Sequence, residues 1–337
     1  MEFLSSLFEL IFTPAFAASV LRITTPILFA ALGGIMARRC GIMNLALEGT
    51  MLTAALFAVI GSALTKRAVL GGVSAALADP ALVSKANFAG IIAGFIVGTV
   101  AGILMALFLA YMAVGLKADA YLAGLAINTM TTGGTVFILY MVAGDKGISS
   151  SLDSGSMPFI DIPIIKDIPV LGEIFSGQNI MTYFSWICVA LVYFILFKTA
   201  TGLRIRAVGE TPSAAESVGV NVKKVQYIAM ALSGLFCGFG GVSLSMSYVQ
   251  FFSRGMTAGK GFIGMSAMNL GNASPVGTAV AAFLFGFFDA MANVMQSMSI
   301  PVQFVQAIPY VATLVGLVVF AIQSDNKVKK LKAKQAK

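Results

Sequence analysis

The 337-residue sequence is 58% hydrophobic, only 11% of its residues are charged, and its mean hydropathy is +0.92. This composition excludes an ordinary soluble globular domain and indicates an integral membrane protein with a net charge of +8. The sequence has no histidine, which excludes the His-Glu-x-x-His metal helix and a Ser-His-Asp arrangement. Cys40, Cys188 and Cys237 have neither metal-ligand nor disulfide spacing. We therefore expect inert cysteines, no metal site and no catalytic site.

Long apolar runs predict the membrane crossings, because a hydrocarbon core of ~30 Å needs ~20 apolar residues in a helix. Residues 3–12 are too short to span and form either an interfacial helix or part of an extra crossing. A short segment at 259–271 is expected to be a short or broken crossing. The predicted fold class is an all-α polytopic membrane protein of about nine transmembrane segments. The full-length crossings are placed near 18–37, 44–64, 88–113, 120–143, 180–198, 225–248, 275–297 and 303–322.

The loops divide the sequence only weakly, so we interpret residues 1–322 as one transmembrane domain. Residues 144–179 contain Pro158 and Pro163 and are long for a simple connection. We expect this external loop to be a lid, a landing surface for a delivery protein or an inert folded loop. Residues 323–337 are Lys-rich and predict a cytoplasmic tail that touches anionic lipid and binds no nucleic acid.

Positive charge sets the expected orientation, because Lys and Arg near helix ends accumulate on the cytoplasmic side. We place the polar segment 199–224 inside the cell and alternate the crossings outward from it. Arg38 and the Lys-rich tail then also lie inside, provided that the short segment changes sides. In this arrangement Lys260 lies outside, and Glu48 and Asp289 are the acidic residues that remain within the membrane.

The polar segment 199–224 interrupts the apolar sequence and predicts a short helix. Thr211 is placed to cap this helix, Pro212 is its first residue, and Gly219 supplies a left-handed stop after about two turns. So short a helix is not stable alone, and the flanking crossings must hold it. On the pattern alone a solvated loop is the simpler interpretation, and a docking surface for another protein is the alternative.

The segment resembles the coupling-helix region of ATP-binding-cassette importer permeases that carry branched-chain amino acids, ribose or nucleosides, which favours the docking surface. The resemblance extends to residues 41–49, 232–241, 256–263 and 271–277, covers most of the chain, and is closest to the nucleoside branch. It implies a type II-like importer permease bundle in the bacterial cytoplasmic (inner) membrane, with the coupling loop on the cytoplasmic side. The residues that match the coupling pattern are Gly202, Leu203, Arg204, Arg206, Ala207, Gly209, Glu210, Pro212, Ala214, Ala215 and Gly219.

The resemblance also implies the partners. These are a cytoplasmic ATP-binding-cassette ATPase, a second permease that is identical or related, an external substrate-binding lipoprotein and a nucleoside substrate. Residues 255–261 are too short for a P-loop and lack Ser or Thr after the Lys, so ATP and Mg²⁺ are expected on the ATPase. We therefore expect no cofactor and no enzymatic activity on this chain. The implied ATPase contacts are Gly202, Arg204, Arg206, Gly209, Glu210, Pro212, Ala214, Ala215 and Gly219.

A weak internal echo favours a duplicated architecture. Residues 31–34 read Ala-Leu-Gly-Gly, and residues 231–234 read Ala-Leu-Ser-Gly. Because the first element runs inward and the second outward, the two halves would form an inverted repeat, an arrangement common in transporters.

Polar residues within the apolar runs mark a candidate translocation path, because polar groups are costly inside a bilayer. Asn44 and Glu48 lie four residues apart and are expected on one helical face. The same spacing relates two further pairs, which are Asn128 with Thr132 and Asp289 with Asn293. The remaining candidates are Phe251, Asn269 and Asn272.

Each candidate has a structural alternative, because interhelical hydrogen bonds of ~1 kcal/mol or less also hold membrane helices together. Glu48 could pair with Arg38 or Arg39 or cap backbone amides, and the face of Asp289 could lie against a partner permease. The alternative substrates are a pentose such as ribose and a branched-chain amino acid. An ion-coupled secondary transporter that uses Asp289 is the more remote alternative.

Overall fold

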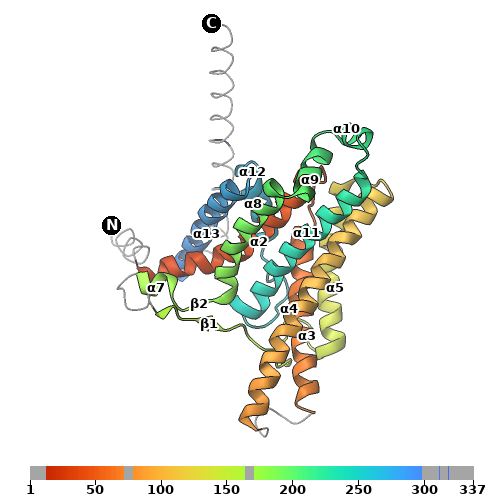
Figure 1. Ribbon diagram of the computed structural model, residues 1–337. Coiled ribbons are helices and arrows are strands. Elements are labelled where there is room, and N and C mark those ends of the chain that lie inside the picture. Colours follow the sequence, from red (N-terminus) through yellow and green to blue (C-terminus); the bar gives the residue numbers. More distant parts are fainter. Residues whose placement is uncertain (1–12, 72–78, 164–170, 298–310, 312–317, 319–337) are drawn as a thin grey trace.

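The computed structural model describes residues 13–71, 79–163 and 171–297, together with Val311 and Val318, and this part of the chain is almost wholly helical (Figure 1). Seven of its helices are long and apolar enough to cross a membrane. Two π-helical turns, η1 (Tyr111–Gly115) and η2 (Leu244–Tyr248), extend α4 and α11. The seven are α2 (Pro14–Arg39), α3 (Leu47–Val69), α4 (Pro80–Ala110), α5 (Ala120–Ala143), α8 (Ile180–Lys198), α11 (Val222–Ser243) and α13 (Pro275–Ser297).

The predicted all-α polytopic class is confirmed, whereas the total of nine crossings is not tested. Apart from Val311 and Val318, the expected crossing at 303–322 lies outside the described residues, as do residues 3–12 and the tail at 323–337. The inverted repeat stays a prediction. The shorter elements are β1 (Phe159–Ile160), α7 (Leu171–Phe175), β2 (Gln178–Asn179), α9 (Ala200–Glu210), α10 (Pro212–Ser217) and α12 (Lys260–Leu270).

Most long helices begin at a side-chain cap that is local in sequence. The side chains of Thr13, Asp79, Asp119, Asn179 and Asn221 each accept a hydrogen bond from a backbone N–H in the first turn of α2, α4, α5, α8 and α11. Proline follows Thr13 and Asp79 directly, and its fixed φ suits the first helical position. The cap at Asp79 explains why α4 begins eight residues before the start expected from hydropathy.

The helices form two groups with α2 and α11 between them (Figure 1). One group contains α3, α4 and α5, and the other contains α8, α12 and α13. Small residues let the central helices approach closely. A Cβ on Gly33 of α2 would lie 2.5 Å from the sulfur of Cys237 in α11, and one on Gly102 of α4 would lie 2.8 Å from the carbonyl oxygen of Gly234. The glycines at 234–241 therefore allow the backbones of neighbouring helices to pack in close contact.

The short helix α12 starts halfway along α2. A Cβ on Gly264 would contact Ala30 and Ala31, and Arg38 donates to Asn269 near the other end of α12. The 11 residues of α12 span ~16 Å, which is about half of a ~30 Å hydrocarbon core. The preceding residues, 249–259, form turns and bends. The expected broken crossing is therefore a half-length helix that ends beside Arg38.

Two expectations are wrong because the chain is non-helical just before α12 and just before α3. Lys260 is the first residue of α12 and lies inside the bundle, not outside, because the chain re-enters before the helix begins. Asn44 and Glu48 do not share a helical face, because α3 begins at Leu47 and Asn44 lies in the non-helical chain before it.

Candidate functional site

The polar segment 199–224 forms two helices instead of the one expected. Thr199 caps α9 through its hydroxyl, which accepts from the backbone N–H of Gly202 at 3.1 Å. Thr211 precedes Pro212 as predicted, but its side chain makes no capping hydrogen bond to α10. Gly219 follows the end of α10 and has a left-handed φ of +84°, as predicted. The segment is therefore an ordered helical pair and not a solvated loop.

The second helix, α10, presents a small mixed face to solvent. Pro212 and Ala214 are exposed, and Val218 is 77% exposed, which is unusual for an apolar side chain. Ala215 is only 4% exposed and packs inward. Of the two alanines predicted to contact an ATPase, only Ala214 is thus available at the surface.

The first helix, α9, lies in close contact with the ends of the membrane helices, because two of its residues are glycines without a side chain. A Cβ on Gly202 would lie 2.0 Å from the carbonyl oxygen of Ile195, and one on Gly209 would lie 2.2 Å from the carbonyl oxygen of Arg39. The guanidinium of Arg206 lies 4.9 Å from the ring centre of Phe197 in α8, so Arg206 binds its own chain. The two charged side chains of the predicted coupling set that remain exposed are Arg204 and Glu210.

The same end of the bundle holds Arg38 and Arg39. Arg38 donates from Nη1 to the side chain of Asn269. Arg39 donates from Nε to the carbonyl oxygen of Ala273 at 3.0 Å and from Nη2 to that of Asn272 at 3.4 Å. Asn269 and Asn272, predicted path residues, therefore take part in a junction between α2 and the turn that joins α12 to α13.

Glu48 caps the buried start of α12. Its carboxylate accepts from the backbone N–H of Gly259 at 2.8 Å and from that of Gly261 at 2.7 Å. This confirms the alternative in which Glu48 satisfies backbone amides, which α12 needs because it has no side-chain cap of its own. Asn44 likewise has a structural role, donating to the hydroxyl of Ser233 at 3.0 Å.

A charged pair lies beside the start of α12. Nζ of Lys260 is 3.5 Å from Oδ2 of Asp289 in α13, with side chains that are 13% and 17% exposed. Asn293, one turn further along α13, is exposed. The half-length helix therefore begins among Glu48, Lys260 and Asp289, three charged groups in the middle of the bundle.

The face of α5 next to Glu48 is open. Asn128 accepts from the backbone N–H of Gly49 at 2.8 Å and donates to the carbonyl oxygen of Leu45 at 2.9 Å, so its amide holds α3 against α5. One turn on, Thr132 is exposed, and a Cβ on Gly133 would meet no atom within 4 Å. Phe251, in the chain leading to α12, is also exposed.

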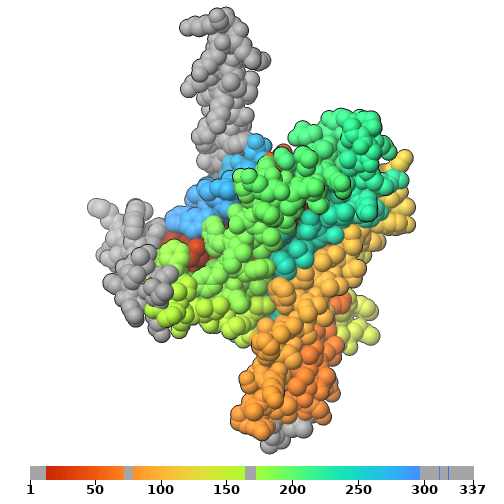
Figure 2. All heavy atoms as spheres, in the orientation of Figure 1, coloured from red at the N-terminus to blue at the C-terminus, as the bar shows by residue number. Residues whose placement is uncertain are grey.

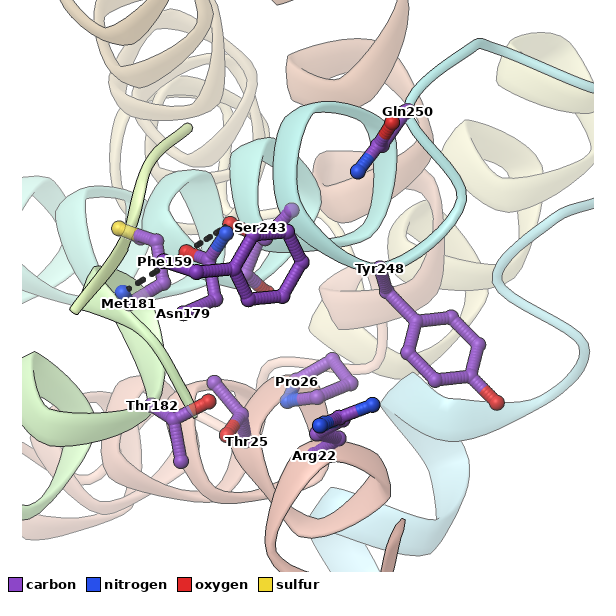
Figure 3. Close-up of a pocket in the computed structure, with 11 residues that line it drawn as sticks. Arg22, Thr25, Pro26, Phe159, Asn179, Met181, Thr182, Ser243, Tyr248 and Gln250 are labelled. Atoms are coloured by element: carbon purple, nitrogen blue, oxygen red, sulfur yellow. Dashed lines mark hydrogen bonds between the residues drawn. The ribbon is translucent and has the colours of Figure 1, made fainter. Parts of the chain in front are cut away.

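A cavity of about 110 Å³ lies between α2, β1, the start of α8 and η2. Figure 3 shows the rings of Phe159 and Tyr248 above Pro26 and Arg22 of α2. Asn179 supports the wall by donating to the carbonyl oxygen of Met157 and accepting from the hydroxyl of Ser247 at 2.7 Å. The lining is amphipathic, since it comprises Arg22, Thr25, Pro26, Phe159, Asn179, Met181, Thr182, Ser243, Ser247, Tyr248 and Gln250.

The sequence interpretation missed this cavity. Its polar residues lie at the outer ends of predicted crossings, where Thr24-Thr25 and Ser243-x-Ser245-x-Ser247 interrupt apolar runs. Those hydroxyls were a usable signal, but single hydroxyl residues are common in membrane helices and often bond to their own backbone. Thr25 and Ser243 do so here.

Comparison with known proteins agrees with this architecture. A guanosine ABC transporter permease protein of Bacillus subtilis, NupQ, is 34% identical over 307 residues, which cover 89% of this chain and 90% of the relative. A nucleoside ABC transporter permease protein of Lactococcus lactis, NupC, is 33% identical over 308 residues, covering 90% and 91%. A putative glucose ABC transporter permease protein of Haloferax volcanii, TsgC13, is 31% identical over 294 residues, covering 85% and 80%.

No solved structure matches the chain significantly. The family model described as the permease component of branched-chain amino acid transport systems matches residues 16–322, nearly the whole chain. Together with the seven membrane-length helices, this match shows that the chain is a multi-pass membrane protein and belongs to that family of permease components.

Proposed function

We propose that this chain is the permease subunit of an ATP-driven importer of nucleosides in the bacterial cytoplasmic membrane. It would pair with a second permease, identical or related, and with a cytoplasmic ATPase that holds ATP and Mg²⁺. An external lipoprotein would deliver the substrate. The observation that carries the nucleoside assignment is the match over about nine-tenths of the chain to permeases named for guanosine and for nucleosides.

The lining of the cavity of Figure 3 has chemistry that suits this substrate class. A nucleoside is uncharged, with a planar base and a hydroxylated sugar. Aromatic side chains such as Phe159 and Tyr248 offer stacking surfaces for a base, and the hydroxyl of Thr182 and the amide of Gln250 offer hydrogen bonds. We assign the cavity as an outer binding site, from which substrate passes to the open face of α5.

The open face of α5 supports a path through the membrane. Non-helical backbone at membrane depth is tolerated only where it is buried in protein or lines a water-filled cavity. Residues 249–259 are non-helical, and Arg254 and Ala258 within them are exposed. A path between this segment, α5 and the second permease would meet that requirement. Closure of the ATPase on α10 would then tilt the bundle between outward-open and inward-open states.

Uptake by cells tests this function directly. Labelled guanosine and uridine are offered to cells with and without the gene, each with excess ribose, glucose or leucine. We expect gene-dependent uptake that none of these competitors reduces. Loss of signal to a sugar or to leucine would move the substrate to that class, and no gene-dependent uptake would contradict an importer of nucleosides.

A cavity variant refines the same assay. Phe159→Ala removes one aromatic wall of the cavity, and because Phe159 is exposed its loss should not disturb folding. We expect the KM for guanosine to rise roughly fivefold or more, as stacking contributes ~1–3 kcal/mol per base. Phe88→Ala, which removes another exposed ring on α4, is the matched control and should leave KM unchanged. An unchanged KM in Phe159→Ala would remove the cavity from the path.

A further inference from the structure

Arg39 lies where three elements meet at the end of the bundle that carries α9 and α10. Its carbonyl oxygen faces Gly209 of α9, where a Cβ would approach to 2.2 Å. Its guanidinium donates to the carbonyl oxygens of Asn272 and Ala273, in the turn between α12 and α13. The carboxylate of Glu210 attracts the same guanidinium. Arg39 therefore contacts the proposed coupling segment and the end of α12 at once.

The helix α12 is held at its other end in the middle of the bundle. Glu48 binds the backbone N–H groups of Gly259 and Gly261, and Lys260 pairs with Asp289. Arg38 adds a bond to Asn269 near the end beside Arg39. A helix of three turns is stiff along its axis, so a displacement at Arg39 reaches Glu48 over ~16 Å.

The chain before α12 can absorb such a displacement. Residues 249–259 are non-helical, and Gln250, Gly255, Ala258 and Gly259 have positive φ. The turn after α12 also carries positive φ, at Asn272 and Ala273. The helix is thus bounded on both sides by turns, while at Gly264 no side chain of α12 projects into α2, where a Cβ would lie 2.8 Å from that of Ala30.

We propose that Arg39 and Glu48 are positioning residues that link the coupling segment to the middle of the membrane through α12. Movement of α9 and α10 displaces Arg39, Arg39 shifts α12, and the start of α12 moves against Glu48 beside the open face of α5. This inference rests on the proposed function, because it needs an ATPase that acts on α10. Neither residue contacts the substrate in this scheme.

A distance measurement on the complete importer tests the link. Spin labels on Ala258→Cys and Thr132→Cys, both at exposed sites, report the position of the start of α12 relative to α5. The three native cysteines are fully buried and give little background. We expect the distance distribution to change when ATP and vanadate close the ATPase, and we expect Arg39→Ala to abolish this change.

Measurements of uptake and of ATP hydrolysis in the same complexes distinguish loss of the link through α12 from a folding defect. Arg39→Ala should lower uptake at least roughly fivefold, the lower range of allosteric coupling, while basal ATP hydrolysis persists. Arg39→Lys keeps the charge with a single nitrogen and should recover part of the uptake. Lys198→Ala, an exposed charge at the end of α8, is the matched control and should behave like the wild type.

Glu48→Gln probes the other end if Arg39→Ala does not fold. The amide keeps one acceptor oxygen and loses the other, so one N–H of Gly259 or Gly261 loses its partner. We expect the nucleotide-dependent distance change to shrink with basal ATP hydrolysis intact. A full distance change with normal uptake in Arg39→Ala or Glu48→Gln would overturn the link alone. A wild-type complex that neither hydrolyses ATP nor responds to it would overturn the proposed function and the link together.

Discussion

The helices α4 and α5 both pack on α3 and both expose one side, but the two exposed sides differ in chemistry. On α4, which lies on the face of the molecule shown in Figure 2, large apolar side chains are exposed at intervals of four from residue 88 onward, namely Phe88, Ile92, Ile96, Val100, Leu104 and Phe108. On α5 the middle of the exposed side carries Thr129, Thr132 and Gly133, which lie among the exposed apolar side chains Leu122, Met130, Phe137 and Met141. The two helices therefore differ at the centre of the crossing, where a polar side chain costs most if it faces lipid.

This contrast indicates which side of the bundle faces lipid. An unbroken apolar stripe from Phe88 to Phe108 is what hydrocarbon chains favour, whereas the hydroxyls and the glycine in the middle of α5 gain nothing there. The start of α12, with Glu48 and Lys260, lies on the side of α5. We therefore interpret α4 as lipid-facing and α5 as facing water or a second permease.

Matched lysines should have the largest effect. Ile96 and Thr132 each lie near the middle of their helix and are exposed. Lysine at the centre of a lipid-facing helix costs about 3 kcal/mol, so Ile96→Lys should lower the amount of folded permease in membranes severalfold. Thr132→Lys should leave that amount close to wild type, because water can solvate the charge. Size-exclusion profiles of solubilised membranes measure both, and equal losses would contradict the contrast.

Matched cysteines should differ in labelling by a charged, membrane-impermeant thiol reagent. The reagent needs water at the thiol, so Thr132→Cys should react at least roughly tenfold faster than Ile96→Cys. Mass spectrometry of labelled peptides gives both rates. Similar rates at the two positions would mean that α5 also faces lipid.

Filling the open space on α5 should affect transport without affecting folding. A side chain at Gly133 meets no atom within 4 Å, and leucine is a better helix former than glycine by ~1 kcal/mol. Gly133→Leu should therefore fold normally while nucleoside uptake falls severalfold, because the path narrows. Val100→Leu enlarges the face of α4 and should leave uptake unchanged. Normal uptake in Gly133→Leu would place the path elsewhere.

The smallest expected effect is at Cys40, which lies just beyond the end of α2 and sets the background of the labelling experiment. Burial raises the pKa of the Cys40 thiol to about 12. Since only the thiolate reacts, and a raised pKa leaves the thiol protonated at pH 8, alkylation by N-ethylmaleimide should be negligible until the protein is denatured. Rapid alkylation of Cys40 in the folded permease would show that this junction opens to water.

Much of the fold could be predicted from sequence, because hydropathy and caps are local. The runs at 120–143, 180–198 and 275–297 became α5, α8 and α13 with the expected bounds. The start of α4 was misplaced, because Asp79-Pro80 outweighs the polar residues that follow it. The helix α9 was missed, because a polar helix pressed on membrane helix ends has no apolar period to reveal it.

The candidate site was predicted less well. Helical spacing grouped Asn44 with Glu48, but the chain breaks between them, and each bonds to a different distant segment. Lys260 was placed with the external charges, because its partner Asp289 lies 29 residues further along the sequence and nothing local joins them.

Composition and short-range sequence patterns were enough to predict that this protein spans a membrane, where most of its helices begin, and that the segment at 199–224 resembles a coupling surface. Each of these depends on composition or on residues close together in the chain, which act through hydropathy and local hydrogen bonds. Only the tertiary structure decided that α12 starts in mid-bundle on Glu48, that Lys260 meets Asp289, and that Arg39 joins α9 to α12. Those contacts link residues far apart in sequence, and no local pattern selects among the partners that a buried polar group could take.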